Sequence, residues 1–140
     1  MSSSYILIFF VAILVVGSIL FAVMTLTKKA SPQLDADKYR SKWMAIEQQL
    51  KRDDSASHQL CVLGGDKLVD QALRERNIKG QTMGERMKTA GPMLSNAGSL
   101  WNAHKLRNQI AHESDARVSF DDARVALSGF KQALKDLGAI

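Results

Sequence analysis

The stretch of the sequence with the most reactive side chains is Leu100–Glu113, which reads LWNAHKLRNQIAHE. On a helix that turns about 100° per residue, His104, Asn108 and His112 follow at four-residue intervals, and Arg107 lies about 60° from His104. The four side chains therefore share one polar arc. A guanidinium binds phosphate oxygens, and an imidazole exchanges protons near neutral pH. These groups could cleave RNA without a metal, because RNA supplies its own 2′-hydroxyl as nucleophile.

Two other kinds of site fit the sequence poorly. His104 and His112 would be about 12 Å apart along a helix, too far to bind one zinc ion together, and no HExxH motif or cysteine lies nearby. Cys61 is the only cysteine, so the chain cannot form an internal disulfide, and it stands in an apolar stripe where a thiol is inert. We therefore expect no metal and no cofactor.

The segment Arg107–His112, RNQIAH, resembles the signature of the HEPN superfamily. That signature is an arginine, four to six intervening residues and a histidine, commonly with a polar residue such as Asn108 directly after the arginine. The resemblance implies a small all-α bundle with metal-independent endoribonuclease activity, paired as a homodimer so that two motifs line one cleft. It implies that Arg107 binds the phosphate, that Asn108 orients it, and that His112 acts as acid or base.

The neighbouring side chains have both functional and structural interpretations. We expect His104, Trp101 and Glu113 to support the site, with His104 orienting it and Trp101 able to stack a base. A tryptophan on a bundle helix more often packs in a core, and Arg107 could simply pair with Glu113 or with an acid on a neighbouring helix. The alternative function is therefore a non-catalytic, membrane-anchored helical module that binds a nucleotide, RNA or a protein, or only dimerises.

The chain from residue 35 onward has the apolar periodicity of helices, and none of it alternates like a strand. The predicted fold is an all-α, antiparallel four- to five-helix bundle preceded by one transmembrane helix. The expected helices run from Asp35 to near Asp53, from a cap at Ser55 or Ser57 to near Asn77, from Thr82 to the break at Gly91–Pro92, from Ser95 or Asn96 to about Glu113, and from Ser119 to Gly138.

Two smaller features of this pattern carry predictions. The pair Gly64 and Gly65 in the middle of a helix is costly, so we expect another helix to pack closely there. His58, near a helix start, is expected at the surface.

An apolar run from Tyr5 to Leu26 precedes the bundle and contains no charged residue and no proline. At roughly 1.5 Å per residue it spans about 33 Å as a helix, which matches a hydrocarbon core of about 30 Å. A cleaved signal peptide would have a shorter apolar region, a basic residue before it and a small-residue cleavage site after it. We therefore predict a single-pass anchor over residues 1–29, a linker over 30–34 and the bundle over 35–140.

The charges suggest how the anchor is oriented. Lys28 and Lys29 follow the apolar run directly, whereas no basic residue precedes it, so we expect the N-terminus outside the cell membrane and the bundle in the cytoplasm. The chain has 19 Lys and Arg against 14 Asp and Glu, and without Lys28 and Lys29 the excess is +3, too little for a strong non-specific binder of polyanions. The predicted function is a membrane-anchored, metal-independent endoribonuclease that acts on RNA at the cytoplasmic face.

Overall fold

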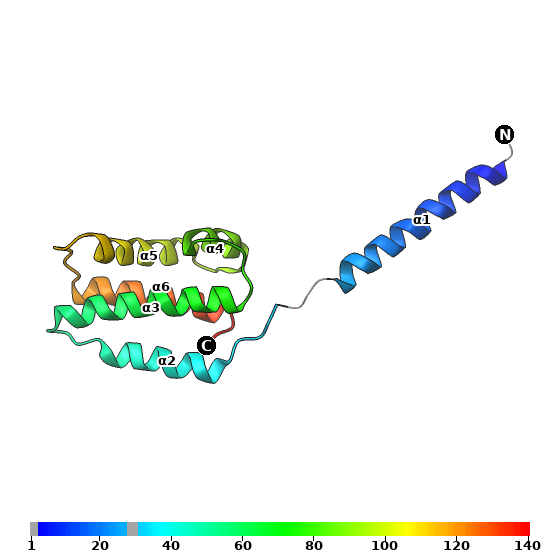
Figure 1. Cartoon of the computed structure of the whole chain (residues 1–140). Helices are drawn as coiled ribbons and strands as arrows, with labels where there is room; N and C mark the ends of the chain where they lie inside the picture. Colours follow the sequence, from blue (N-terminus) through cyan, green and yellow to red (C-terminus); the bar gives the residue numbers. More distant parts are fainter. Residues whose placement is uncertain (1–2, 28–30) are drawn as a thin grey trace. The chain divides into compact units, whose positions relative to one another are not determined.

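The structure, a computed structural model, describes residues 3–27 and 31–140. The chain divides into two compact units, Met1–Ser31 and Pro32–Ile140. Six α-helices and no strand occur in the described ranges (Figure 1), so the all-α prediction is confirmed. The HEPN-like form of the bundle stays a prediction.

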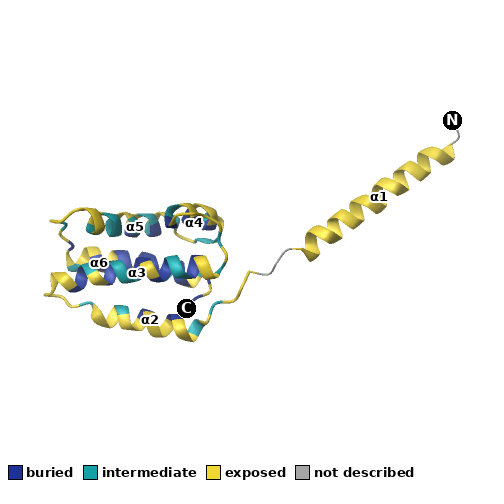
Figure 2. Ribbon diagram, viewed as in Figure 1, coloured by how far each residue is buried: buried dark blue, intermediate teal, exposed yellow. Residues whose placement is uncertain are grey.

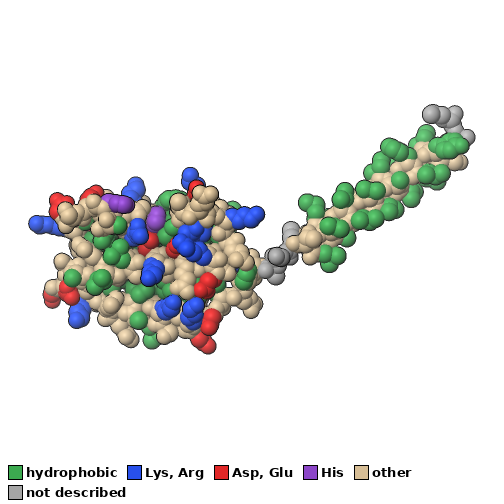
Figure 3. Space-filling view, in the orientation of Figure 1, with side chains coloured by type: hydrophobic (Ala, Val, Ile, Leu, Met, Phe, Trp, Pro, Cys, Tyr) green, Lys and Arg blue, Asp and Glu red, His purple; other side chains and the backbone are tan. Residues whose placement is uncertain are grey.

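The first unit contains helix α1 (Ser3–Leu26), which is long and apolar enough to cross a membrane. Its mean hydropathy is 3.2, and none of its residues is buried within the protein. On the face seen in Figure 3, hydrophobic side chains line α1 along its length. The same properties also suit a signal sequence near an N-terminus. Lys28 and Lys29, on which the predicted orientation depends, lie outside the described residues, as does Ala30 of the linker.

The second unit is a bundle whose helices are joined by short loops. Its elements are α2 (Ala36–Gln49), α3 (Ser55–Glu75), α4 (Met83–Ala90), a 3₁₀ helix (Gly91–Met93), α5 (Ala97–His112) and α6 (Phe120–Asp136).

Helix α3 is central to this unit and contacts α2, α4, α5 and α6. The helices α2, α3, α5 and α6 run in alternating directions along the chain (Figure 1). Helices α3 and α6 bury a large part of their surface in the core, whereas α2 buries only a narrow strip along one side (Figure 2). The core includes the fully buried side chains of Tyr39, Leu73, Leu100 and Phe130. Because α3 touches all four other α-helices of the unit, its polar residues are well placed to link them.

The glycine pair lies where helices approach closely, as predicted. A β-carbon on Gly65 would be 2.6 Å from Cδ2 of Phe130 on α6, well inside van der Waals contact. A β-carbon on Gly64 would meet Ile46 on α2 at an ordinary 3.5 Å. Gly65 is therefore the member of the pair that the packing requires.

The junction between α2 and α3 differs from the prediction. Helix α2 ends at Gln49 instead of near Asp53, and Asp54 caps α3 in place of Ser55 or Ser57. The hydroxyl of Ser57 accepts a hydrogen bond from the N–H of Lys51 at 3.0 Å. Ser57, one of the residues expected to cap α3, instead holds the backbone just after α2. Helix α2 therefore ends early.

The other helix starts follow the sequence closely. Thr82 caps α4, Asn96 caps α5, and Ser119 forms a capping box with Asp122 at the start of α6. Each cap satisfies a backbone N–H that the first helical turn leaves unpaired. These three caps fix where α4, α5 and α6 begin, and so which side chains of α4 and α5 face α3.

His58 is buried, contrary to its expected place at the surface. Its Nδ1 lies 2.9 Å from the carbonyl oxygen of Val118, and its Nε2 lies 2.7 Å from the carbonyl oxygen of Lys51. A neutral imidazole can donate only one hydrogen bond, so both contacts are satisfied only when the ring is protonated. The hydrogen bond to Val118, then that to Lys51, and the nearby Asp54 carboxylate raise the pKa of His58.

We expect the stability of this unit to fall as the pH rises above about 6.5, the ordinary pKa of histidine. A pKa that is higher in the folded state than in the unfolded chain adds stability below about pH 6.5, and this stability is lost as the pH rises through the folded value. Thermal melting between about pH 6 and pH 9 measures the effect. His58→Gln should flatten the profile over this range; an unchanged profile would show that the two carbonyls do not favour the imidazolium.

Candidate functional site

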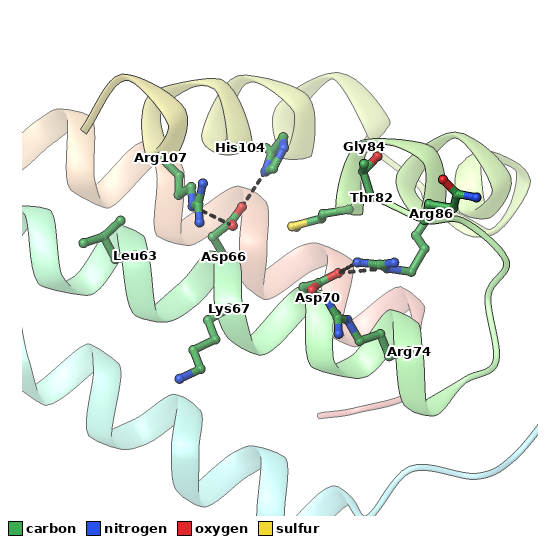
Figure 4. Close-up of a pocket in the computed structure, with 12 residues that line it drawn as sticks. Leu63, Asp66, Lys67, Asp70, Arg74, Thr82, Gly84, Arg86, His104 and Arg107 are labelled. Carbon is green, nitrogen blue, oxygen red and sulfur yellow. Dashed lines mark hydrogen bonds and ion pairs between the residues drawn. The ribbon is translucent and has the colours of Figure 1, made fainter. Parts of the chain in front are cut away.

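An open pocket of about 630 Å³ lies between α3, α4 and α5. One face of α3 forms its floor, with Leu63, Asp66, Lys67 and Asp70 at helical spacing. The start of α4 and the side chains of His104 and Arg107 on α5 complete it (Figure 4). Part of the polar arc predicted on α5 therefore faces a pocket.

Asp66 is the residue that organises the α5 side of this pocket. Its Oδ1 lies 2.7 Å from Nδ1 of His104, and its Oδ2 lies 3.3 Å from Nε of Arg107 (Figure 4). The Asp66 side chain is only 5% exposed. A buried carboxylate is costly unless it is paired, so these two contacts also hold α5 against α3.

The contact with Asp66 determines which nitrogen of His104 can act as a base. An ionised carboxylate only accepts hydrogen bonds, so Nδ1 of His104 carries the hydrogen and donates it. The lone pair then lies on Nε2, which has no hydrogen-bond partner among the described residues. A carboxylate that holds an imidazole by one nitrogen and leaves the other free is an arrangement suited to proton transfer.

The structure brings Arg107 to His104 and Asn108, and it does not bring His112 into the pocket. Nη1 of Arg107 donates to Oδ1 of Asn108 at 3.0 Å. His112 is the last residue of α5 and is exposed. The reason is helical geometry, because five residues at about 100° each place the Arg107 and His112 side chains about 140° apart.

The two remaining supporting residues also lie outside the pocket lining. Trp101 is half-buried against the core, and its ring meets that of His104 edge to face at 6.2 Å. This is the packing role that the sequence left open as its alternative. Glu113 is exposed, and Arg107 pairs with Asp66 instead of with Glu113.

Asp66 is the residue of this candidate site that sequence reasoning missed. Its signal was present: it stands on the apolar side of α3, beside Gly65 and two residues before Leu68. A charged residue in a core stripe needs a partner on another helix. The sequence alone does not say which basic side chain that partner is, since α3 and α5 meet only in the folded bundle.

No group of His, Cys, Asp or Glu side chains suited to hold a metal ion is found in the described ranges. Cys61 is fully buried, and its Sγ lies 3.3 Å from the carbonyl oxygen of Ile46. Burial raises the pKa of the Cys61 thiol, so the thiolate is disfavoured and the residue serves as packing.

A scan against protein-family models gives no match to the chain. Searches of curated proteins and of solved structures give no significant match either. Function must therefore be inferred from the site itself.

Proposed function

We propose that this protein is a membrane-anchored endoribonuclease that cleaves RNA without a metal ion. In this proposal α1 crosses the cell membrane once, with the N-terminus outside, and the bundle acts at the cytoplasmic face. The observation that carries the proposal is the convergence of His104 and Arg107 on the buried carboxylate of Asp66 at the wall of an open pocket.

Each group has a chemical role in the proposed reaction. The 2′-oxygen of the RNA attacks the adjacent phosphorus and forms a 2′-O–P bond, while the bond from phosphorus to the 5′-oxygen of the next nucleotide breaks. Nε2 of His104 takes the 2′-hydroxyl proton and returns it to the leaving 5′-oxygen. Arg107 stabilises the added negative charge on the phosphate oxygens. The products are a 2′,3′-cyclic phosphate and a 5′-hydroxyl.

The resemblance of RNQIAH to the HEPN signature supports the same activity from the sequence. It assigns the imidazole to His112, whereas the pocket favours His104, and both assignments include Arg107 with Asn108 beside it. A homodimer that places a second motif opposite the first is also part of the resemblance. The choice between the two histidines is open to a direct kinetic test.

The proposal predicts metal-free cleavage that depends on Arg107. The full chain in detergent micelles, incubated with mixed RNA in EDTA, is expected to release 2′,3′-cyclic phosphate ends. Arg107→Ala should lower kcat by about 10²–10³-fold, the usual effect of removing one group that stabilises developing charge. Arg117→Ala is the matched control, because Arg117 is exposed and lies outside the pocket lining.

The alternative function is a non-catalytic anchored module. The ion pair between Arg107 and Asp66 supports it, because an arginine that serves only to neutralise a buried acid has the same contact. If Arg107→Ala and Arg117→Ala cleave RNA equally, or if the wild-type chain does not cleave, the nuclease proposal is wrong and this alternative replaces it.

A further inference from the structure

The pocket has a second acidic residue that organises basic side chains, one helical turn along α3 from the first. Oδ1 of Asp70 accepts from Nε and Nη2 of Arg86 at 2.9 and 2.7 Å. Oδ2 of Asp70 accepts from Nε of Arg74 at 3.0 Å. Asp66 also binds two side chains, since its Oδ1 contacts His104 and its Oδ2 contacts Arg107. The pocket wall is therefore built as two similar clusters, each with one carboxylate and two nitrogen-containing side chains.

The clusters leave positive charge unbalanced in the pocket. Its lining includes the side chains of Lys67, Arg74, Arg86 and Arg107, against the carboxylates of Asp66 and Asp70. Lys67 is exposed and makes no ion pair with any residue that the structure describes. A concave surface with an excess of cations concentrates anions.

The cluster around Asp70 also has hydrogen-bond donors to spare. Arg86 is fixed, because its side chain is 6% exposed and its Nη1 donates to the carbonyl oxygen of Gly80 at 2.9 Å. Arg74 is held only through Nε, and its side chain is 65% exposed. Its two terminal nitrogens have no partner within residues 3–27 and 31–140, so they are free to bind an anion in a forked manner.

We propose that Arg74 binds a second phosphate of the RNA, next to the phosphate that is cleaved at Arg107, and that Lys67 adds positive charge at the edge of the same pocket. This inference rests on the proposed function. Asp66 and Asp70 are about 6 Å apart along α3, so the basic side chains that they hold lie in successive turns along one wall of the pocket. The ligand is therefore a single-stranded RNA that lies along α3, with the cleaved linkage beside His104 and the neighbouring linkage at Arg74.

Binding of an RNA that cannot react tests this subsite without relying on catalysis. The probe is a short, fluorescent, single-stranded oligonucleotide with 2′-O-methyl groups, titrated by anisotropy against the full chain in phosphatidylcholine nanodiscs. Arg74→Gln and Lys67→Gln should each weaken binding several-fold. They should also reduce the slope of log K against log salt by about 0.7 for each phosphate that the protein no longer neutralises. Arg40→Gln and Lys105→Gln, exposed and outside the pocket lining, should change neither quantity.

The outcomes separate this inference from the proposed function. Loss of binding in the two pocket variants supports the subsite even if the chain never cleaves RNA. Binding equal to wild type in both variants overturns it, even if Arg107 proves essential for cleavage. The inference is also overturned if Arg74 and Lys67 are needed for binding to nanodiscs of anionic lipid and are not needed for binding the oligonucleotide.

Discussion

Asp66→Asn is expected to lower kcat for metal-free RNA cleavage by about 10²-fold or more, with little change in KM. An asparagine at this position offers one acceptor atom where the aspartate offers two, so it cannot hold both His104 and Arg107. Loss of the group that orients a catalytic imidazole typically has an effect of this size or larger. Single-turnover rates on one RNA substrate measure it.

Glu75→Gln is the matched control, since Glu75 also lies on α3 and binds side chains of a neighbouring helix, but it lies outside the pocket lining. It does not contact His104 or Arg107, so kcat should stay within about threefold of the wild-type value. Circular dichroism confirms that both variants are folded. The pH dependence of kcat should change in Asp66→Asn and not in Glu75→Gln. Equal kcat in the two variants would show that Asp66 has only a structural role.

Gly65→Ala is expected to destabilise the bundle by about 1–3 kcal/mol, the usual cost of overpacking a core. The added methyl group would lie 2.6 Å from Cδ2 of Phe130, so the fully buried ring would have to shift. Denaturation of residues 32–140 in urea measures the free energy of unfolding. This segment is a suitable sample because it forms a compact unit with its own core.

Gly64→Ala is the control for the effect of glycine on helix formation. Its methyl group would meet Ile46 at 3.5 Å without strain, and alanine is favoured over glycine in a helix by up to about 1 kcal/mol. We therefore expect the two neighbouring substitutions to have opposite signs. Destabilisation of similar size in both would contradict the packing of α3 against α6 at Gly65.

The sequence predicts the helices well because their signals are local. The caps at Thr82 and Ser119 and the apolar stripe from Phe120 to Leu137 act within a few residues of chain, and each appears in the structure. The sequence predicts the junction after α2 less well. The end of α2 is set by Ser57 and His58, which bind the backbone of Lys51 from the next helix, so no pattern within α2 could reveal it.

The candidate site shows the same division between local and distant information. Sequence reasoning placed Arg107 and His104 on one arc of a helix, and both line the pocket. It missed Asp66, which is 38 residues from His104 in the sequence and meets it only when α3 packs against α5. It gave the catalytic role to His112 and a supporting role to His104, because which part of an arc faces a neighbouring helix depends on the packing.

The rate of RNA cleavage by His104→Ala and His112→Ala, measured for the full chain in EDTA, tests the assignment of the catalytic imidazole most directly. We predict that His104→Ala lowers kcat by about 10²-fold or more, the usual contribution of general acid–base catalysis, while His112→Ala stays within about threefold of wild type. Wild-type activity in His104→Ala would contradict the proposal that His104, held by Asp66, is the catalytic imidazole.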